Sequence, residues 1–161
     1  MNRKPKRKRD CSVKATKQGA THKPPMRIVS SPPPKHVYDG CREAFELSGA
    51  EIWCYGNTIH NPSGGHLSFP LIAHERTHRD QQGDDIDGWW ELYLEDQDFR
   101  LQQEMEAHTV EYRVFCLRQK NSKLKLAYLE NIGERLSSGT YGSIIPKEAA
   151  MHMVAKGRKK S

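Results

Sequence analysis

The sequence predicts an α+β protein with a mostly helical body, a small β-hairpin or sheet and a disordered N-terminal tail. Three observations lead to this prediction. Residues 1–35 are basic and lack apolar periodicity, and two short β-prone runs flank a Gly-Asn turn at residues 56–57. Several later segments carry apolar residues at the three- and four-residue spacing of helices. A chain of 161 residues has the length of one domain.

Composition divides the chain into three parts. Residues 1–35 end in Ser-Ser-Pro-Pro-Pro and contain too few apolar side chains to offset the entropy of ordering. We therefore expect a disordered basic tail over residues 1–35, one folded domain over residues 36–155 and a basic C-terminal tail over residues 156–161. Near the start of the domain, Arg42–Leu47 is expected to form a short helical turn.

The folded domain is expected to begin with a hairpin and continue as helices. The runs Ala50–Tyr55 and Thr58–His60 suit strands, since both contain β-branched or aromatic residues and only two turn residues separate them. We expect Ser68 to cap the first long helix and Asp98 to cap the longest one, because both residue types accept hydrogen bonds from helix N-termini. The five predicted helices cover about 68–83, 89–95, 99–117, 124–136 and 147–154.

The net charge of +6 conceals an uneven distribution. Residues 1–35 hold eleven basic residues against one acidic residue, and residues 156–161 add four basic residues. The 120 residues between them carry 11 basic and 19 acidic groups. The sequence therefore predicts an acidic body with basic ends, in which only the ends favour contact with phosphate.

Several protein classes are disfavoured by what the sequence lacks. No apolar run is long enough to span a bilayer, and the basic N-terminus is not followed by the apolar segment of a secretory signal. The four cysteines form no CxxC pair, which disfavours a cysteine-rich zinc finger. We expect a cytoplasmic protein with reduced thiols.

The chemistry-bearing motif is His74-Glu75-Arg76-Thr77-His78, an H-E-x-x-H sequence on a predicted helix. Histidines four residues apart project from the same face, so both imidazoles can reach one Zn²⁺ ion. Glu75 lies beside that face, where it can reach a water molecule on the metal without binding the metal itself. This spacing predicts a zinc site with a neighbouring general base.

The longest predicted helix offers a third ligand. Glu104 lies on a stripe of otherwise apolar residues, where a carboxylate is costly to bury unless it is paired or binds a metal. His108 lies one turn further along the same stripe and is the rival third ligand. Glu106 points away from the stripe and is expected to be solvated.

These two motifs resemble the gluzincin class of zinc metallopeptidases, in which H-E-x-x-H is followed on a second helix by E-x-x-A. The resemblance implies that residues 36–155 form a zincin-like metallopeptidase domain, in which His74, His78 and Glu104 bind the metal and Glu75 is the general base. His108 occupies the position where the family commonly has an Asp that orients a ligand histidine, so His108 is either such an orienting residue or an alternative ligand. The compact layout also resembles small metallopeptidases of bacteriophages and prophages, which implies association with a host cell or virion.

The function predicted from this resemblance is zinc-dependent hydrolysis of a peptide bond in a peptide or protein substrate. The alternative is a non-catalytic, zinc-stabilised binding module that contacts nucleic acid through its N-terminal tail. The basic residues of that tail attract phosphates without sequence preference, and the candidates are Lys4, Lys6, Arg7, Lys8 and Arg9. Glu75 discriminates between the two functions, because a structural zinc site needs no general base.

Overall fold

The computed structural model describes residues 24–157, which form a mostly helical structure with one small mixed sheet. The predicted fold class is confirmed. In chain order the elements are β1 (Arg27–Val29), α1 (Lys35–Ala44), β2 (Trp53–Tyr55), β3 (Thr58–His60), α2 (Phe69–Gln82), α3 (Ile86–Glu95), α4 (Gln97–Arg118), α5 (Ser122–Ser137), η1 (Gly139–Tyr141) and α6 (Lys147–Gly157).

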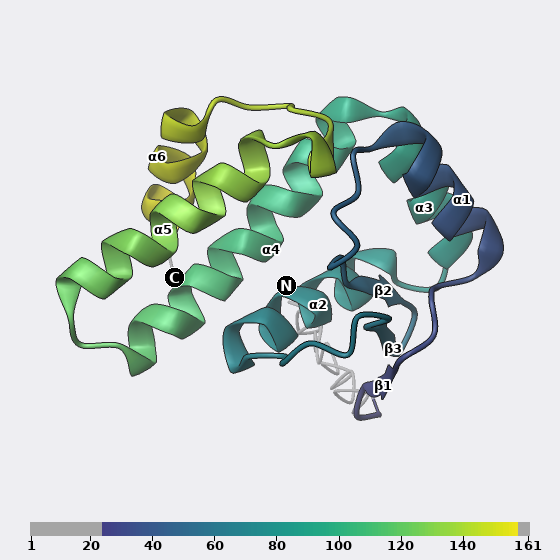
Figure 1. Cartoon of the computed structure of the whole chain (residues 1–161), viewed down its shortest axis with the longest axis horizontal. Coiled ribbons are helices and arrows are strands. Elements are labelled where there is room, and N and C mark those ends of the chain that lie inside the picture. The colour runs from purple at the N-terminus through teal and green to yellow at the C-terminus, as the bar shows by residue number, and fades with distance from the viewer. Residues whose placement is uncertain (1–23, 158–161) are drawn as a thin grey trace, which may run out of the picture.

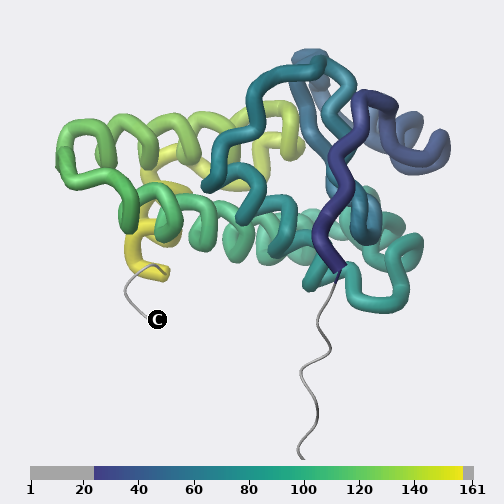
Figure 2. Tube along the Cα trace, turned by 90° about the horizontal axis from the view of Figure 1, so that it is seen from below, coloured from purple at the N-terminus to yellow at the C-terminus, as the bar shows by residue number. Residues whose placement is uncertain are grey.

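Helix α4 organises the fold because it contacts elements on both sides of the molecule (Figure 1). Its 22 residues give a length of about 33 Å. Helices α5 and α6 pack beside one part of α4, whereas α1, α3 and the sheet lie toward its other end (Figures 1 and 2). Helix α2 packs against α4 between these two groups.

Two hydrophobic cores hold these groups of helices. One core joins α4, α5 and α6 and contains Met105, Tyr112, Leu129, Ile132, Leu136 and Val154. The other joins α1, β2 and α3 and contains Val37, Cys41, Trp53, Trp89, Trp90 and Tyr93. Burying an apolar side chain of this size stabilises the fold by about 1.5–3 kcal/mol, so the two cores fix the positions of α3, α4 and α5 around α2.

The sheet has the strand order β1-β3-β2, and the predicted hairpin of β2 and β3 is confirmed. Gly56 turns the chain with φ at +54°, a conformation that L side chains rarely adopt. The side chain of Gln82, at the end of α2, fastens that helix to the hairpin. Its Nε2 donates to Cys54 O at 2.7 Å, and its Oε1 accepts from Gly56 N at 2.8 Å.

The predicted disorder of residues 1–35 is wrong for residues 27–29. These residues form β1, which pairs in parallel with β3. The backbone makes this contact, for example through Asn61 N donating to Val29 O at 2.8 Å. Because the side chains of Arg27 and Ile28 remain exposed, the strand carries no apolar alternation that would reveal it in the sequence.

Several predicted boundaries also shift. Helix α1 covers Lys35–Ala44 instead of Arg42–Leu47, because Val37 and Cys41, one turn apart, anchor it in the core. The cap of α4 is Asp96, not Asp98; its carboxylate accepts from the backbone N–H groups of residues 98 and 99 at 2.9 Å. Helix α6 extends through Gly157, so the first two residues of the predicted C-terminal tail are helical.

Ser68 caps α2 as predicted, and Pro70 fits its first turn. Helix α2 ends at Gln82, next to the predicted stop at Gly83. Among residues 24–157, no helix has the length and apolar character needed to cross a membrane.

Candidate metal centre

Helices α2 and α4 bring the two sequence motifs together in a buried cluster of His74, His78 and Glu104, which we call the metal cluster. The Nε2 atoms of His74 and His78 lie 2.9 Å apart. Glu104 Oε2 lies 3.6 Å from His74 Nε2, and Glu104 Oε1 lies 3.4 Å from His78 Nε2. Ligand atoms about 2.1 Å from one metal ion are separated by about 2.9–3.6 Å at bond angles of about 90–120°, so these distances suit a shared cation.

Buried atoms without partners support the same interpretation. Glu104 Oε2 and Glu75 Oε2 are buried and find no hydrogen-bond partner within residues 24–157. Leaving a buried polar group unsatisfied costs about 1–3 kcal/mol, and more when the group is charged. A cation between the two helices would satisfy Glu104 Oε2. The other oxygen, Glu104 Oε1, already accepts from the Tyr93 hydroxyl at 2.6 Å.

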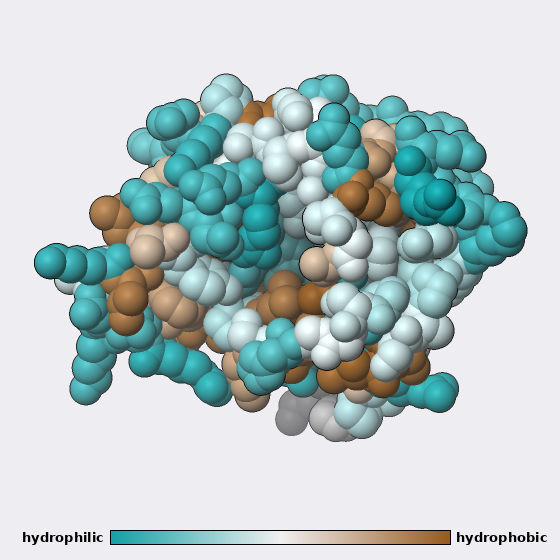
Figure 3. All heavy atoms as spheres, in the orientation of Figure 1, coloured by the Kyte–Doolittle hydropathy of each residue, from teal (hydrophilic) through white to brown (hydrophobic). Residues whose placement is uncertain are grey.

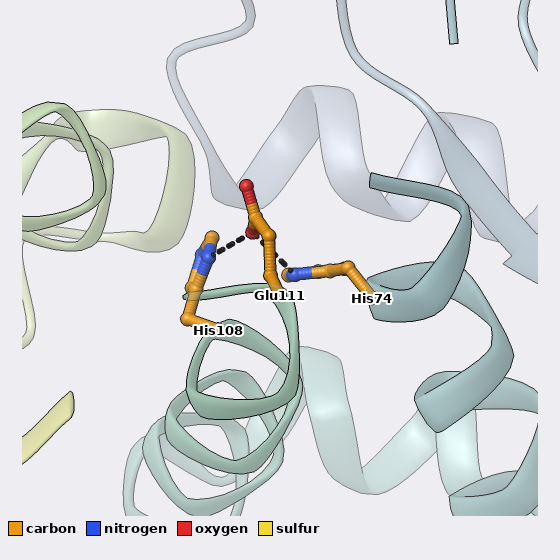
Figure 4. A group of neighbouring side chains, drawn as sticks. All are labelled: His74, His108 and Glu111. Carbon is orange, nitrogen blue, oxygen red and sulfur yellow. Dashed lines mark hydrogen bonds and ion pairs between the residues drawn. The ribbon is translucent and has the colours of Figure 1, made fainter. Parts of the chain in front are cut away.

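Hydrogen bonds at the opposite ring nitrogens orient both histidines of the cluster. His74 Nδ1 lies 3.0 Å from Glu111 Oε2 (Figure 4), and His78 Nδ1 lies 2.8 Å from Gln81 Oε1. Both partners are oxygen acceptors, so each Nδ1 carries the proton. Each Nε2 therefore presents a lone pair to the cluster, which is the arrangement that metal-binding histidines use.

Glu111 is the site residue that the sequence analysis missed. It is 1% exposed, and its carboxylate accepts four hydrogen bonds, from His74, His108, Tyr128 and Arg135. Burial raises the pKa of Glu111, but His108, His74 and Arg135 outweigh burial and hold it well below its usual range. The signal in the sequence is its spacing: Glu111 lies seven residues after Glu104 and continues the same helical stripe, which points its carboxylate toward the metal cluster.

The predicted general base, Glu75, is buried beside the metal cluster. Burial, together with the carboxylates of Glu104 and Glu111, raises its pKa well above the usual range. A carboxyl group with a raised pKa holds a proton more readily, which suits a group that accepts a proton and passes it on. A cation held nearby would favour its ionised form.

Ala107, the small residue of the E-x-x-A motif, is fully buried in α4, the helix that packs against α2. Glu106 is exposed, as predicted, and its Oε2 accepts from Gln81 Nε2 at 2.9 Å.

A cavity of about 310 Å³ opens onto the metal cluster. His74, Glu75, His78 and Glu104 line it together with Arg135. Its remaining walls are largely apolar and include Phe45, Leu47, Ile52, Trp53, Leu71 and Trp90. The space-filling view shows a hollow in the middle of the molecule with hydrophobic side chains at its border (Figure 3). A ligand in this cavity can therefore reach the carboxylate of Glu75 and the cluster at once.

Comparisons with protein-family models, curated proteins and solved structures find no match to this chain. The resemblance to gluzincins remains a prediction from two short motifs. The structure adds a buried His/His/Glu cluster that could hold a metal ion. The candidate nucleic-acid-binding residues Lys4, Lys6, Arg7, Lys8 and Arg9 lie outside the described residues.

Proposed function

We propose that the protein is a zinc-dependent hydrolase that cleaves peptide bonds. The observation that carries this proposal is the position of Glu75, a buried carboxylate that adjoins the metal cluster and lines the same cavity. A site that only stabilises the fold has no use for an unpaired carboxylate at this place, because burying it lowers stability.

His74, His78 and Glu104 supply two nitrogens and one oxygen, a ligand set typical of catalytic zinc. When bound, Zn²⁺ polarises a substrate carbonyl and lowers the pKa of a water molecule. Glu75 would take a proton from the attacking water on the cavity side; the water oxygen bonds to the carbonyl carbon, the C–N bond breaks and Glu75 returns the proton to the leaving amine. Glu111 and Gln81 keep the two imidazoles in the orientation that binding requires.

The cavity favours a peptide substrate with an apolar side chain. Its aromatic and aliphatic walls would bury such a side chain next to the cluster, at about 25 cal/mol for each Å² of apolar surface. Strand β2 borders the cavity through Trp53 and Cys54 and lies at an edge of the three-stranded sheet. An extended peptide can pair with such an edge through its backbone.

The experiment compares Glu75→Gln with Glu91→Gln, a matched control at an exposed residue of α3 that does not line the cavity. Both proteins are loaded with one equivalent of zinc and assayed on a library of peptides. We expect Glu75→Gln to retain zinc and to lose at least about 100-fold in hydrolysis rate, the contribution of a general base. Unchanged hydrolysis in Glu75→Gln would contradict the proposal.

The charge distribution favours a second candidate, a zinc-stabilised module that contacts nucleic acid through the basic N-terminal segment. Under this proposal the full-length chain binds DNA weakly and its affinity falls steeply with salt. Replacing Lys4, Lys6, Arg7, Lys8 and Arg9 with Gln would abolish binding while zinc content stays unchanged. Zinc binding without cleavage of any peptide in the library would favour this candidate over hydrolysis.

A further inference from the structure

His108 lies beside the metal cluster and has one ring nitrogen without a partner. Its Nδ1 lies 2.7 Å from Glu111 Oε2, the same oxygen that accepts from His74 Nδ1 (Figure 4). Its Nε2 finds no hydrogen-bond partner in the described part of the chain and lies 3.6 Å from Glu104 Oε2. The side chain is 0% exposed, so bulk water does not satisfy this nitrogen.

The hydrogen bond to Glu111 fixes the tautomer of His108. A carboxylate only accepts, so Nδ1 carries the proton and Nε2 presents a lone pair. Glu104 Oε2, which is also unpartnered among residues 24–157, presents lone pairs to the same space. Two buried lone-pair atoms 3.6 Å apart repel each other unless a cation lies between them. Their separation matches that of two ligands on one metal ion.

His108 lies next to the metal cluster but is not part of the cavity wall. His74, His78 and Glu104 line the cavity, whereas His108 does not. The rings of His74 and His108 are neighbours, with centroids 4.4 Å apart. A catalytic zinc site can expand to five ligands, so three histidines and Glu104 still leave a position for a substrate on the cavity side.

We propose that His108 is a further metal ligand through Nε2, so that three histidines and Glu104 hold the cation and Glu111 orients two of them. This inference rests on the proposed metal centre and extends its ligand set beyond the three residues that the resemblance implies. It also explains why one carboxylate oxygen, Glu111 Oε2, accepts from two imidazoles: both rings must present Nε2 to the same ion.

The test counts the coordinating histidines in the cobalt-loaded protein by proton NMR. Paramagnetic Co²⁺ shifts the ring N–H proton of each bound imidazole far from the other signals. We expect three shifted, slowly exchanging ring N–H signals in the wild type and two in His108→Phe. Tyr128→Phe is the matched control, because it removes a different hydrogen bond to Glu111 and should keep all three signals.

Metal affinity provides a second measurement, made by competition with a chelator. Loss of an orienting partner typically lowers affinity about 10–100-fold, and loss of a ligand should exceed that range. We expect His108→Phe to lose more than about 100-fold and Tyr128→Phe to lose no more than about 100-fold. Equal losses in the two variants would indicate that His108 acts only through Glu111.

Two shifted signals in the wild type would overturn the inference without a variant having to fold. If zinc-loaded protein still cleaves peptides in that case, the proposed hydrolase stands and only the role of His108 fails. Three signals without peptide cleavage would leave His108 as a ligand and contradict the hydrolase. A protein that binds no Co²⁺ or Zn²⁺ would overturn both.

Discussion

The replacement Glu111→Gln tests whether a single buried carboxylate organises the metal centre. Glu111 is 1% exposed and accepts from two imidazoles, one hydroxyl and one guanidinium through two oxygens. The amide of Gln has the same shape but only one accepting atom. If that oxygen stays with His74 and His108, the amide nitrogen faces the donors of Tyr128 and Arg135.

The expected loss of stability follows from the two hydrogen bonds that the amide cannot make. Hydrogen bonds to a charged group each contribute about 1.5–3 kcal/mol, which gives an upper range of about 3–6 kcal/mol. The Arg135 side chain is one-third exposed and recovers part of its loss from water. We therefore expect Glu111→Gln to lower the free energy of unfolding by about 3 kcal/mol, a large share of the 5–15 kcal/mol that is typical of a domain.

Urea denaturation of the metal-free protein measures this change, and zinc titration with a competing chelator measures the effect on the site. Because Glu111 orients a ligand histidine, we expect zinc affinity to fall about 10–100-fold. Glu91→Gln, at an exposed residue of α3, is the control and should change neither quantity appreciably. If Glu111→Gln were as stable as Glu91→Gln and bound zinc equally well, the carboxylate would not organise the centre.

Three further predictions concern other parts of the structure. Metal-free Glu75→Gln should be more stable than the wild type above pH 4.5, because the pKa of Glu75 is raised in the folded protein and ionising this buried group lowers native stability. The difference in free energy of unfolding should grow by up to about 1.4 kcal/mol per pH unit. Denaturation at pH 5, 6 and 7 measures this difference, and a difference that does not change with pH would contradict the prediction. Burial raises the pKa of Cys41 to about 11 and that of Cys54 further, so iodoacetamide at pH 8 should label both thiols of the native protein slowly, and rapid labelling detected by mass spectrometry would show that they are accessible. Asp96→Ala should lower the free energy of unfolding by about 0.5–2 kcal/mol through loss of the α4 cap, and Asp98→Ala should lower it less. Thermal denaturation measures both values, and a larger loss in Asp98→Ala would indicate that Asp98 is the cap.

Local sequence patterns predict much of the fold. The spacing of apolar residues predicts the helices, and the Gly-Asn turn predicts the hairpin, because both depend on neighbours within a few residues. Such local patterns do not predict strand β1, because residues 27–29 pair with residues 58–60 through the backbone and two of the three β1 side chains stay exposed. Helix α1 is displaced for a similar reason: its position depends on packing against α3 and β2, which its own sequence does not reveal.

The candidate site also contains residues that local sequence patterns predict and one residue, Glu111, that they do not. His74, Glu75 and His78 share one helix, and Glu104 belongs to a recognisable second motif, so sequence analysis predicts that they meet. Glu111 resembles an ordinary surface carboxylate unless the stripe from Glu104 is followed for two more turns. Its role depends on partners from α2 and α5, which only the tertiary structure brings to it.

Metal analysis of the purified full-length protein tests whether the buried cluster binds a metal ion. We expect one zinc ion per chain in the wild type and none in the double variant His74→Ala/His78→Ala, whose folding is checked by circular dichroism. Zinc retained at one equivalent by the folded double variant, or a wild type that takes up no divalent cation even when zinc is supplied, would show that the cluster is not a metal site.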